Sequence, residues 1–224
     1  MNKVLIVDDE KEIADLVEIY LENDGYQVYK FYNGEDALNC ILNNDIDLAI
    51  LDVMLPDIDG FSLCRKIREK FYFPIIMLTA KVEDMDKITG LTIGADDYIT
   101  KPFSVKLVLM RVEAVLRRVK EREGQEATTT LSYGNIRLDR ESHSVSVGGT
   151  PVSLTHTEYG LLELFMLHPG RVFTRDNLLN QVWGYDFVGE EKTVNIHIMN
   201  LRRKLDADLI ETIRGVGYRL GKEN

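Results

Sequence analysis

The sequence predicts a two-domain α/β protein, in which a doubly wound (βα)5 domain with a five-stranded parallel sheet precedes an α+β domain. The 224 residues are enough for two domains of roughly 100 residues each. The first half alternates short apolar segments with amphipathic ones, whereas strand patterns precede helices in the second half. A polar stretch separates the halves, so we place the domains at 1–119 and 131–224 and an exposed linker at 120–130.

The first half carries the parallel sheet. We expect strands at 4–7, 27–31, 48–51, 75–78 and 98–99, and helices at 11–23, 34–43, 60–70, 84–92 and 104–119. Several of the strands are apolar with little alternation, which is typical of strands buried on both faces. Ligands in such sheets bind at the carboxyl ends of the strands.

The second half begins with short strands. We expect strands at 131–133, 136–138, 144–147 and 151–153, helices at 156–167, 175–183 and 191–205, and strands at 210–213 and 218–220. The pair Gly148-Gly149 indicates a hairpin turn. Thr155 and Glu158 have the spacing of a capping box, and Thr174 can cap the following helix.

Composition limits where the protein works. No apolar run approaches the roughly 20 residues that span a bilayer, and the start of the chain does not resemble a signal peptide. We therefore expect a cytoplasmic protein without membrane insertion.

The net charge of −10 is concentrated in the first half of the chain. Residues 1–120 hold 15 Lys/Arg and 22 Asp/Glu, whereas residues 127–224 hold 11 Lys/Arg and 12 Asp/Glu. DNA binding would therefore need basic side chains gathered on one face of the second domain.

Acidic residues end two strands of the predicted sheet. Asp8 and Asp9 follow the first strand, and Asp52 follows the third. Because the carboxyl ends of parallel strands converge, these carboxylates would repel one another without a compensating cation. Mg²⁺ takes oxygen ligands and offsets the charge of a phosphoryl group, so the pattern predicts a magnesium site.

Two further strand ends supply phosphate-binding groups. Thr79 offers a hydroxyl donor and Lys101 an ammonium group, and the 101–102 peptide bond can be cis. Both suit a phosphoryl group on Asp52, which would act as the nucleophile. Taken singly, Asp8 or Asp9 also fits a helix cap, Asp52 a turn and Thr79 a structural role, but together the five residues indicate a phosphoryl-transfer site.

Residues 1–119 resemble the receiver domain of bacterial response regulators. The matching motifs are VDDE at 7–10, LDVMLP at 51–56, DG at 59–60, LTA at 78–80 and DDYITKPF at 96–103. The resemblance implies that a sensor histidine kinase phosphorylates Asp52, that the receiver itself catalyses this transfer, and that it slowly dephosphorylates itself.

The same resemblance assigns further roles in the pocket. It implies that Asp9, Asp52 and the carbonyl of Met54 bind Mg²⁺, with Asp8 assisting through water. It also implies a switch pair, in which the hydroxyl of Thr79 moves to the phosphate and the ring of Tyr98 turns inward.

Residues 131–222 resemble the winged-helix effector of the OmpR/PhoB family. The matching motifs are LTHTEYGLL at 154–162, RDNLLNQVWG at 175–184, TVNIHIMNLRRKL at 193–205 and IRGVGY at 213–218. The resemblance implies a transcription factor, not an enzyme, with promoter DNA and RNA polymerase as partners.

The helix at 191–205 has the pattern of a DNA-reading helix. Its apolar stripe should face the core, and polar or basic groups lie beside or opposite it, at Lys192, Asn195, Met199, Asn200, Arg202 and Arg203. We expect an asparagine to pair with adenine and Met199 to contact a thymine methyl, at an A·T-rich site. Arg214, on the predicted hairpin tip, suits a minor groove or a phosphate.

The receiver resemblance also implies a phosphorylation-dependent homodimer. Its interface would include Lys87, Ile88, Leu91, Asp96, Asp97, Arg111 and Arg118. We expect Asp97 and Arg111 to pair between subunits. Leu107 and Met110 depart from the family pattern and make the face more apolar, which changes the strength of dimerisation or its dependence on phosphate.

Two segments are similar to VanR-type regulators of glycopeptide resistance, IDLAILD at 46–52 and DKITGLTIGADDYITKPF at 86–103. This likeness implies a VanS-like sensor kinase and promoters of cell-wall precursor genes.

Two other classes of protein share some of these features. A phosphatase of the haloacid dehalogenase class also uses an aspartate and Mg²⁺. Such an enzyme needs Asp-x-Asp after the first strand, where this chain has Asp8-Asp9. Sustained turnover of a small phosphoester would favour this class.

A protein-interaction module would fit the acidic net charge, but basic residues cluster in the second half. Binding that weakens with salt would indicate phosphate contacts.

Overall fold

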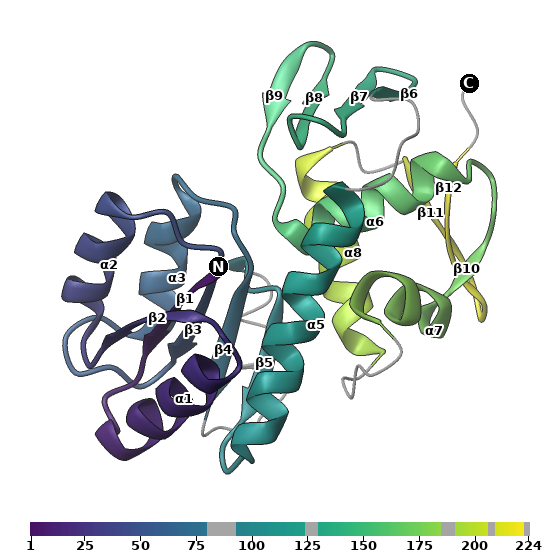
Figure 1. Cartoon of the computed structure of the whole chain (residues 1–224). Helices are drawn as coiled ribbons and strands as arrows, with labels where there is room; N and C mark the ends of the chain where they lie inside the picture. The colour runs from purple at the N-terminus through teal and green to yellow at the C-terminus, as the bar shows by residue number, and fades with distance from the viewer. Residues whose placement is uncertain (80–92, 124–129, 185–190, 206–208, 222–224) are drawn as a thin grey trace. The chain divides into compact units, whose positions relative to one another are not determined.

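The computed structural model describes residues 1–79, 93–123, 130–184, 191–205 and 209–221, with the side chains of 118–123 left out (Figure 1). The chain forms two compact units, Met1–Leu116 and Arg117–Asn224, each with its own hydrophobic core. No helix within the described ranges is long and apolar enough to cross a membrane.

The first unit is built on a five-stranded parallel sheet with the order β2-β1-β3-β4-β5. Its strands are β1 (Lys3–Val7), β2 (Gln27–Phe31), β3 (Leu48–Asp52), β4 (Ile75–Thr79) and β5 (Asp97–Thr100). β3 and β4 are buried along their whole length because helices cover both faces of the sheet. This topology confirms the predicted doubly wound fold and brings the ends of β1 and β3 side by side.

Helices cover the two faces of this sheet (Figure 1). They are α1 (Lys11–Asn23), α2 (Gly34–Asn43), α3 (Gly60–Arg68) and α5 (Val105–Glu123). α1 and α5 share one apolar core with the sheet, whereas α2 and α3 contact each other on the opposite face. The helix predicted at 84–92 lies outside the described residues, and α5 continues to Glu123, into the segment expected as a linker.

The second unit begins with a four-stranded antiparallel sheet in the order β6-β7-β8-β9. Its strands are β6 (Thr130–Tyr133), β7 (Ile136–Asp139), β8 (Ser144–Val147) and β9 (Thr150–Val152). Gly148 and Gly149 form the predicted two-residue turn between β8 and β9. Both have positive φ angles, 57° and 82°, which glycine adopts without strain.

Three helices and a second sheet complete this unit. They are α6 (His156–Leu167), α7 (Arg175–Leu178) continued by the π-helix η1 (Leu179–Trp183), α8 (Lys192–Lys204), β10 (Phe173–Thr174), β11 (Ile210–Ile213) and β12 (Gly217–Leu220). The sequence predicted neither β10 nor the π-helical turn. β10 can pair with β12 because Gly217 has no side chain; a Cβ there would lie 1.9 Å from the carbonyl oxygen of Phe173.

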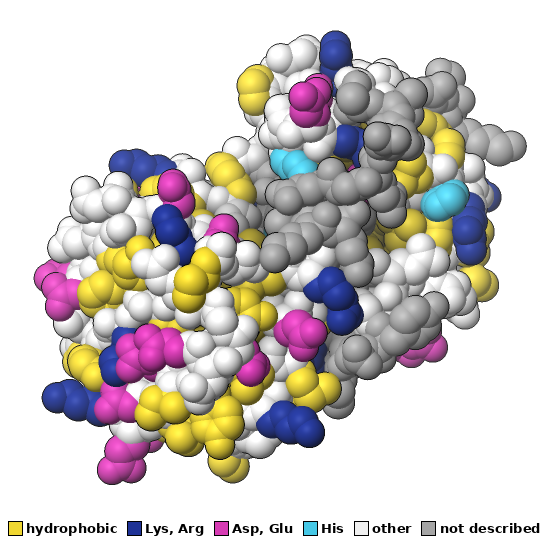
Figure 2. Space-filling model, in the orientation of Figure 1, with side chains coloured by type: hydrophobic (Ala, Val, Ile, Leu, Met, Phe, Trp, Pro, Cys, Tyr) yellow, Lys and Arg dark blue, Asp and Glu magenta, His cyan; other side chains and the backbone are white. Residues whose placement is uncertain are grey.

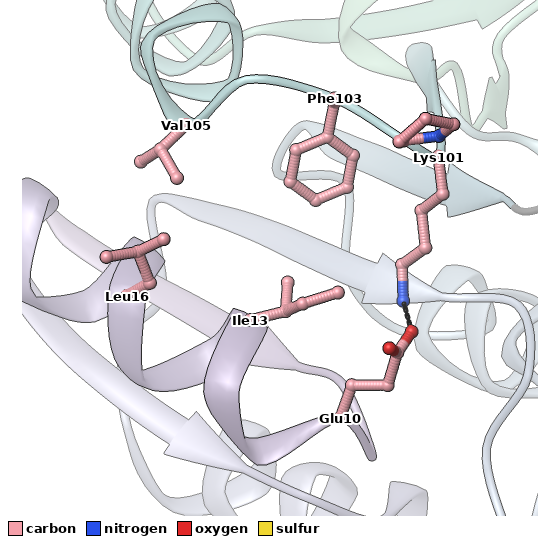
Figure 3. A pocket seen from close by; sticks show the side chains of 7 residues that line it. Glu10, Ile13, Leu16, Lys101, Phe103 and Val105 are labelled. Carbon is pink, nitrogen blue, oxygen red and sulfur yellow. Dashed lines mark hydrogen bonds and ion pairs between the residues drawn. The ribbon is translucent and has the colours of Figure 1, made fainter.

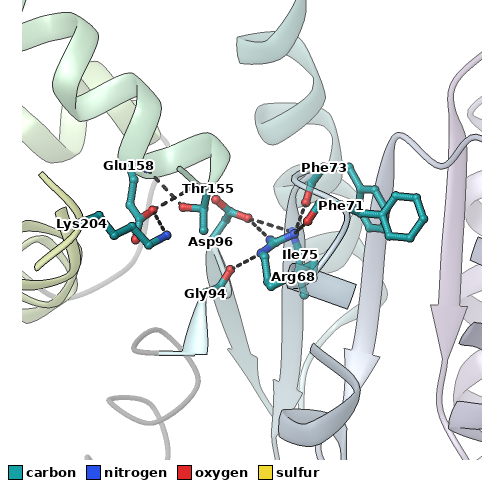
Figure 4. A network of polar contacts seen from close by, with 9 residues as sticks. All are labelled: Arg68, Phe71, Phe73, Ile75, Gly94, Asp96, Thr155, Glu158 and Lys204. Carbon is teal, nitrogen blue, oxygen red and sulfur yellow. Dashed lines mark hydrogen bonds and ion pairs between the residues drawn. The ribbon is translucent and has the colours of Figure 1, made fainter. Parts of the chain in front are cut away.

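The predicted capping box opens α6 and also holds α8. The hydroxyl of Thr155 accepts from the backbone N–H of Glu158 at 3.3 Å, and the Glu158 carboxylate accepts from the N–H of Thr155 at 2.8 Å. The same carboxylate binds Lys204 Nζ at 2.6 Å (Figure 4). The last turn of α8 is therefore anchored to the first turn of α6.

Candidate functional site

Three carboxylates converge at the carboxyl edge of the parallel sheet. Asp8 directly follows β1 and is 0% exposed, and Asp52 ends β3 and is 2% exposed. The carboxylate oxygens of Asp8, Glu10 and Asp52 all lie within 4.8 Å of one another. The fold thus produces the predicted meeting of strand-end aspartates, and it adds Glu10 to them.

Lys101 joins these three carboxylates. Its Nζ lies 2.9 Å from Asp8 Oδ2, 2.9 Å from Asp52 Oδ2 and 2.8 Å from Glu10 Oε1. The Lys101–Pro102 peptide bond is cis, which the sequence allowed. The ammonium group of Lys101 therefore offsets part of the negative charge of these three carboxylates.

The pocket changes the acidity of its members. Burial raises the pKa of Asp8 from 3.8 to about 6, and the hydrogen bond from Lys101 opposes this rise while the nearby Asp52 carboxylate adds to it. Burial alone would lower the pKa of Lys101, but its hydrogen bonds to Asp52, Glu10 and Asp8 raise that pKa above its ordinary value. Lys101 is therefore a permanent cation near neutral pH.

The donor set fits Mg²⁺, because carboxylate oxygens within one small cluster are the ligands this ion prefers. The predicted direct ligand Asp9 is exposed and lies outside the cluster, whereas Asp8, expected to act through water, is inside it. Asp8 and Asp52 share Lys101 as a partner, and each carboxylate lies 2.9 Å from its Nζ. Glu10 was missed as a site residue, although the run of three acidic residues at 8–10 was a visible signal.

The loop after β3 is closely folded around Asp52. The backbone N–H of Met54 donates to Asp52 Oδ1 at 3.3 Å, and the N–H of Gly60 donates to the Val53 carbonyl at 2.9 Å. A Cβ on Gly60 would lie 2.0 Å from the carbonyl oxygen of Asp52, so only glycine allows this approach. Asp57, in the same loop, accepts from the first backbone N–H groups of α2 and links the loop to that helix.

Thr79 and Tyr98 lie on neighbouring strands with their side chains on the same side of the sheet. Thr79 pairs with Thr100, and Tyr98 is two residues before Thr100 on β5. Thr79 is buried at the end of β4, and Tyr98 is half-buried. This placement suits the expected switch pair, which stays a prediction.

The residues expected at a dimer face divide into two groups. Lys87, Ile88 and Leu91, and the side chain of Arg118, lie outside the described part of the chain. Asp97 and Arg111 are buried and pair within the chain at 3.0 Å. Pairing of these two residues between subunits stays a prediction.

Asp96 is also buried, and it has a structural role within the first unit. Its carboxylate binds the guanidinium of Arg68 at 2.8 Å and the backbone N–H of Ile75 at 3.0 Å (Figure 4). Arg68 further donates to the carbonyls of Gly94 and Phe73. This network ties the end of α3 to the start of β4, so Asp96 has little surface to offer a partner.

The outward face of α8 carries four of the residues predicted to contact DNA. Lys192, Asn195, Met199 and Arg203 are exposed and recur every three or four residues along the helix. Arg214 is exposed in the turn between β11 and β12. These five side chains are accessible to a ligand.

Two other residues predicted to contact DNA pack or form hydrogen bonds within the second unit. Asn200 is only 1% exposed. Arg202 donates to the Ile210 carbonyl at 2.9 Å and to the Thr212 hydroxyl at 2.7 Å, which ties α8 to β11. Burial of Asn200 departs from the prediction because the buried side of α8 also includes His197 and is wider than one apolar stripe. A contact of Arg202 with DNA stays a prediction.

Asn195 belongs to a polar cluster that sequence reasoning did not identify. Its Oδ1 accepts hydrogen bonds from Arg175 Nε and from the hydroxyl of Tyr218, each at 2.8 Å. Arg175 begins α7 and Tyr218 lies on β12, so three elements meet at this asparagine. Such a contact between distant residues leaves no mark in the local pattern.

Comparison with known proteins agrees with this geometry. Residues 4–113 match the family described as the response regulator receiver domain, and residues 149–220 match the family described as transcriptional regulatory protein, C terminal. A mutant of RitR is 30% identical over 100% of both chains, with a TM-score of 0.82. The response regulator DrrB, a Thermotoga maritima OmpR/PhoB homologue, is 32% identical over 99% of this chain and 100% of its own, with a TM-score of 0.53.

A likeness limited to the first unit adds to these. A putative response regulator from Chloroflexus aurantiacus is 41% identical over 52% of this chain and 98% of its own, with a TM-score of 0.50. The fold, the acidic pocket and these relatives define a transcription factor with a receiver and a DNA-binding effector domain. The chain belongs to the response regulators of the OmpR/PhoB type.

Proposed function

We propose that a sensor histidine kinase phosphorylates Asp52 and that this modification controls binding of the second domain to promoter DNA. The observation that carries the proposal is the cluster of Asp8, Asp52 and Lys101 at the carboxyl edge of the sheet. It combines a nucleophilic carboxylate with a cation that can bind the incoming phosphoryl group. The cytoplasm, where promoter DNA is found, is the compartment we propose.

The pocket residues suit in-line transfer of a phosphoryl group. A carboxylate oxygen of Asp52 would attack phosphorus, forming a P–O bond while the P–N bond to the kinase histidine breaks. Lys101 would then donate to a phosphoryl oxygen, and the Thr79 hydroxyl to another. Mg²⁺ would be held by Asp52 and Asp8, which lie in the carboxylate cluster with Glu10, and by Asp9 and the Met54 carbonyl, as the family resemblance implies. The ion would offset negative charge on the phosphoryl oxygens.

Phosphorylation with a small donor tests this assignment directly. Acetyl phosphate and Mg²⁺ should add one phosphoryl group to the full-length protein, measured by intact mass. Asp52→Asn should take up none, and Lys101→Met should react more slowly. Equal uptake by Asp52→Asn would place the phosphoryl group elsewhere and contradict the proposal.

The surface beside the pocket suits docking of the kinase. A cavity of about 400 Å³ lies between α1 and the segment after β5, lined by Ile13, Leu16, Phe103 and Val105, with Lys101 at its edge (Figure 3). Apolar side chains also gather at the surface over α1 (Figure 2). An apolar face next to the phosphorylation site can hold a kinase helix while its histidine reaches Asp52.

We further propose the regulatory setting that the sequence indicates. The phosphorylated receiver would form a homodimer, and the bound dimer would act on RNA polymerase. The likeness of 46–52 and 86–103 to VanR-type regulators supports a VanS-like kinase and promoters of glycopeptide-resistance genes. Expression profiling of a strain with the phosphoryl-deficient Asp52→Asn variant, under glycopeptide exposure, tests this assignment.

A further inference from the structure

The side chain of Asn195 is fixed in one orientation on the exposed face of α8. Its Oδ1 accepts from Arg175 Nε and from the Tyr218 hydroxyl, both at 2.8 Å. Arginine Nε can only donate, so the amide atom that faces it must be the oxygen. A carbonyl oxygen has two lone pairs, and two hydrogen bonds use both of them.

The surrounding residues hold this arrangement in place. Tyr218 is buried on β12, and its ring lies beneath two guanidinium groups, with centroid distances of 5.1 Å to Arg175 and 5.6 Å to Arg202. Arg202 is itself anchored to the backbone carbonyl of Ile210. The Asn195 amide is therefore positioned before any ligand arrives, and it presents only the two N–H donors of Nδ2.

This orientation changes which base edge the residue can recognise. Pairing of asparagine with adenine requires the amide to donate to N7 and to accept from N6, and in Asn195 the acceptor is already used. Guanine offers two adjacent acceptors in the major groove, N7 and O6, which suit a group that only donates. The adenine pairing expected from the sequence is incompatible with these contacts.

We propose that Asn195 is a specificity-determining residue that selects guanine over adenine at one position of the DNA site, because Arg175 and Tyr218 occupy its carbonyl oxygen. The proposal rests on the DNA-binding function proposed above. It deepens that function by assigning the hydrogen-bonding character of one base contact.

Selection of binding sites from random DNA, using the full-length protein with beryllofluoride and Mg²⁺, tests the proposal. Binding isotherms should then compare the selected site with single-base changes for wild type and three variants. Asn195→Ala removes the amide, and Asn195→Asp keeps an oxygen toward Arg175 but turns an acceptor outward. Tyr218→Phe keeps the ring and frees one lone pair of Asn195. Circular dichroism shows whether each variant is folded.

The wild-type protein should prefer guanine over adenine by about tenfold at one position, and Asn195→Ala should lose the preference at that position alone. Asn195→Asp should favour cytosine at that position, because cytosine N4 donates a hydrogen bond. Tyr218→Phe should bind adenine there more readily than wild type does, because one lone pair of the Asn195 oxygen is then free. A wild-type preference for adenine at the position that Asn195→Ala affects would overturn the proposal. So would an Asn195→Ala variant with every preference unchanged. Enrichment of no sequence by any of these proteins would refute the DNA-binding function itself.

Discussion

At the scale of single residues, the Asp8 carboxylate is held in a place that disfavours its charge. Its raised pKa means that the folded chain keeps this proton to a higher pH than the unfolded chain does. The contribution of Asp8 to stability therefore falls as pH rises from 3.8 to about 6. Burial of the Asp8 carboxylate therefore costs stability near neutral pH and places a negative charge where a cation could bind it.

Replacing this carboxylate should stabilise the metal-free protein. Asparagine has the same size and keeps one acceptor, so we expect Asp8→Asn to raise the free energy of unfolding by about 1–3 kcal/mol at pH 7. At pH 4 the effect should nearly vanish, because Asp8 is then protonated. Urea denaturation with a chelator at both pH values measures the difference. A variant less stable than wild type at pH 7 would contradict this account of the pocket.

Single residues also show what sequence could and could not predict. Asp8, Asp52 and Lys101 were found because each lies at the end of a strand of one parallel sheet or directly after it, and the topology brings such positions together. The contacts of Glu10 with Lys101 and of Arg175 with Asn195 were not predicted, because they join residues that are distant in the sequence. Tertiary contacts also decide the place of Asp97 and Arg111, which the sequence suggested for a subunit interface and which are buried as a pair within one chain.

At the scale of elements, α1 presents an apolar face beside the phosphorylation pocket. Leu16 is 45% exposed and lines the cavity next to Lys101. We expect Leu16→Glu to slow phosphotransfer from the partner kinase about tenfold, because a charge would be buried against the kinase helix. The rate with acetyl phosphate, which needs no docking, should stay unchanged.

A matched variant controls for general effects of a surface charge. Leu42 on α2 is similarly exposed, at 49%, but belongs to a helix on the other face of the sheet. Leu42→Glu should leave both phosphorylation rates at the wild-type level. If Leu16→Glu slowed both reactions equally, α1 would support the pocket and not the docking of the kinase.

The helices show which buried positions the periodicity of apolar residues can predict and which it cannot. The stripe of Val194, Ile198 and Leu201 is buried as predicted, and the capping box at Thr155 forms. Periodicity could not show that Asn200 is buried, because the width of the covered side depends on how α8 packs against α6 and β11. The short β10 escaped prediction since a two-residue strand has no pattern of its own.

At the scale of the whole molecule, two units with separate cores carry separate chemistries. The first holds a carboxylate that can be phosphorylated, and the second presents an exposed helical face with Lys192, Asn195, Met199 and Arg203. A regulator requires that the state of the first unit changes the DNA affinity of the second. Such coupling is a difference in free energy between two states, and DNA binding measures it.

DNA binding with and without a phosphoryl mimic tests this coupling most directly. The full-length protein and Asp52→Asn should be compared on a selected DNA site, with Mg²⁺ present and with or without beryllofluoride. We predict that beryllofluoride tightens binding by wild type about tenfold or more and leaves Asp52→Asn unaffected. Equal affinity under all four conditions would show that the receiver does not control the effector domain, and it would contradict the account.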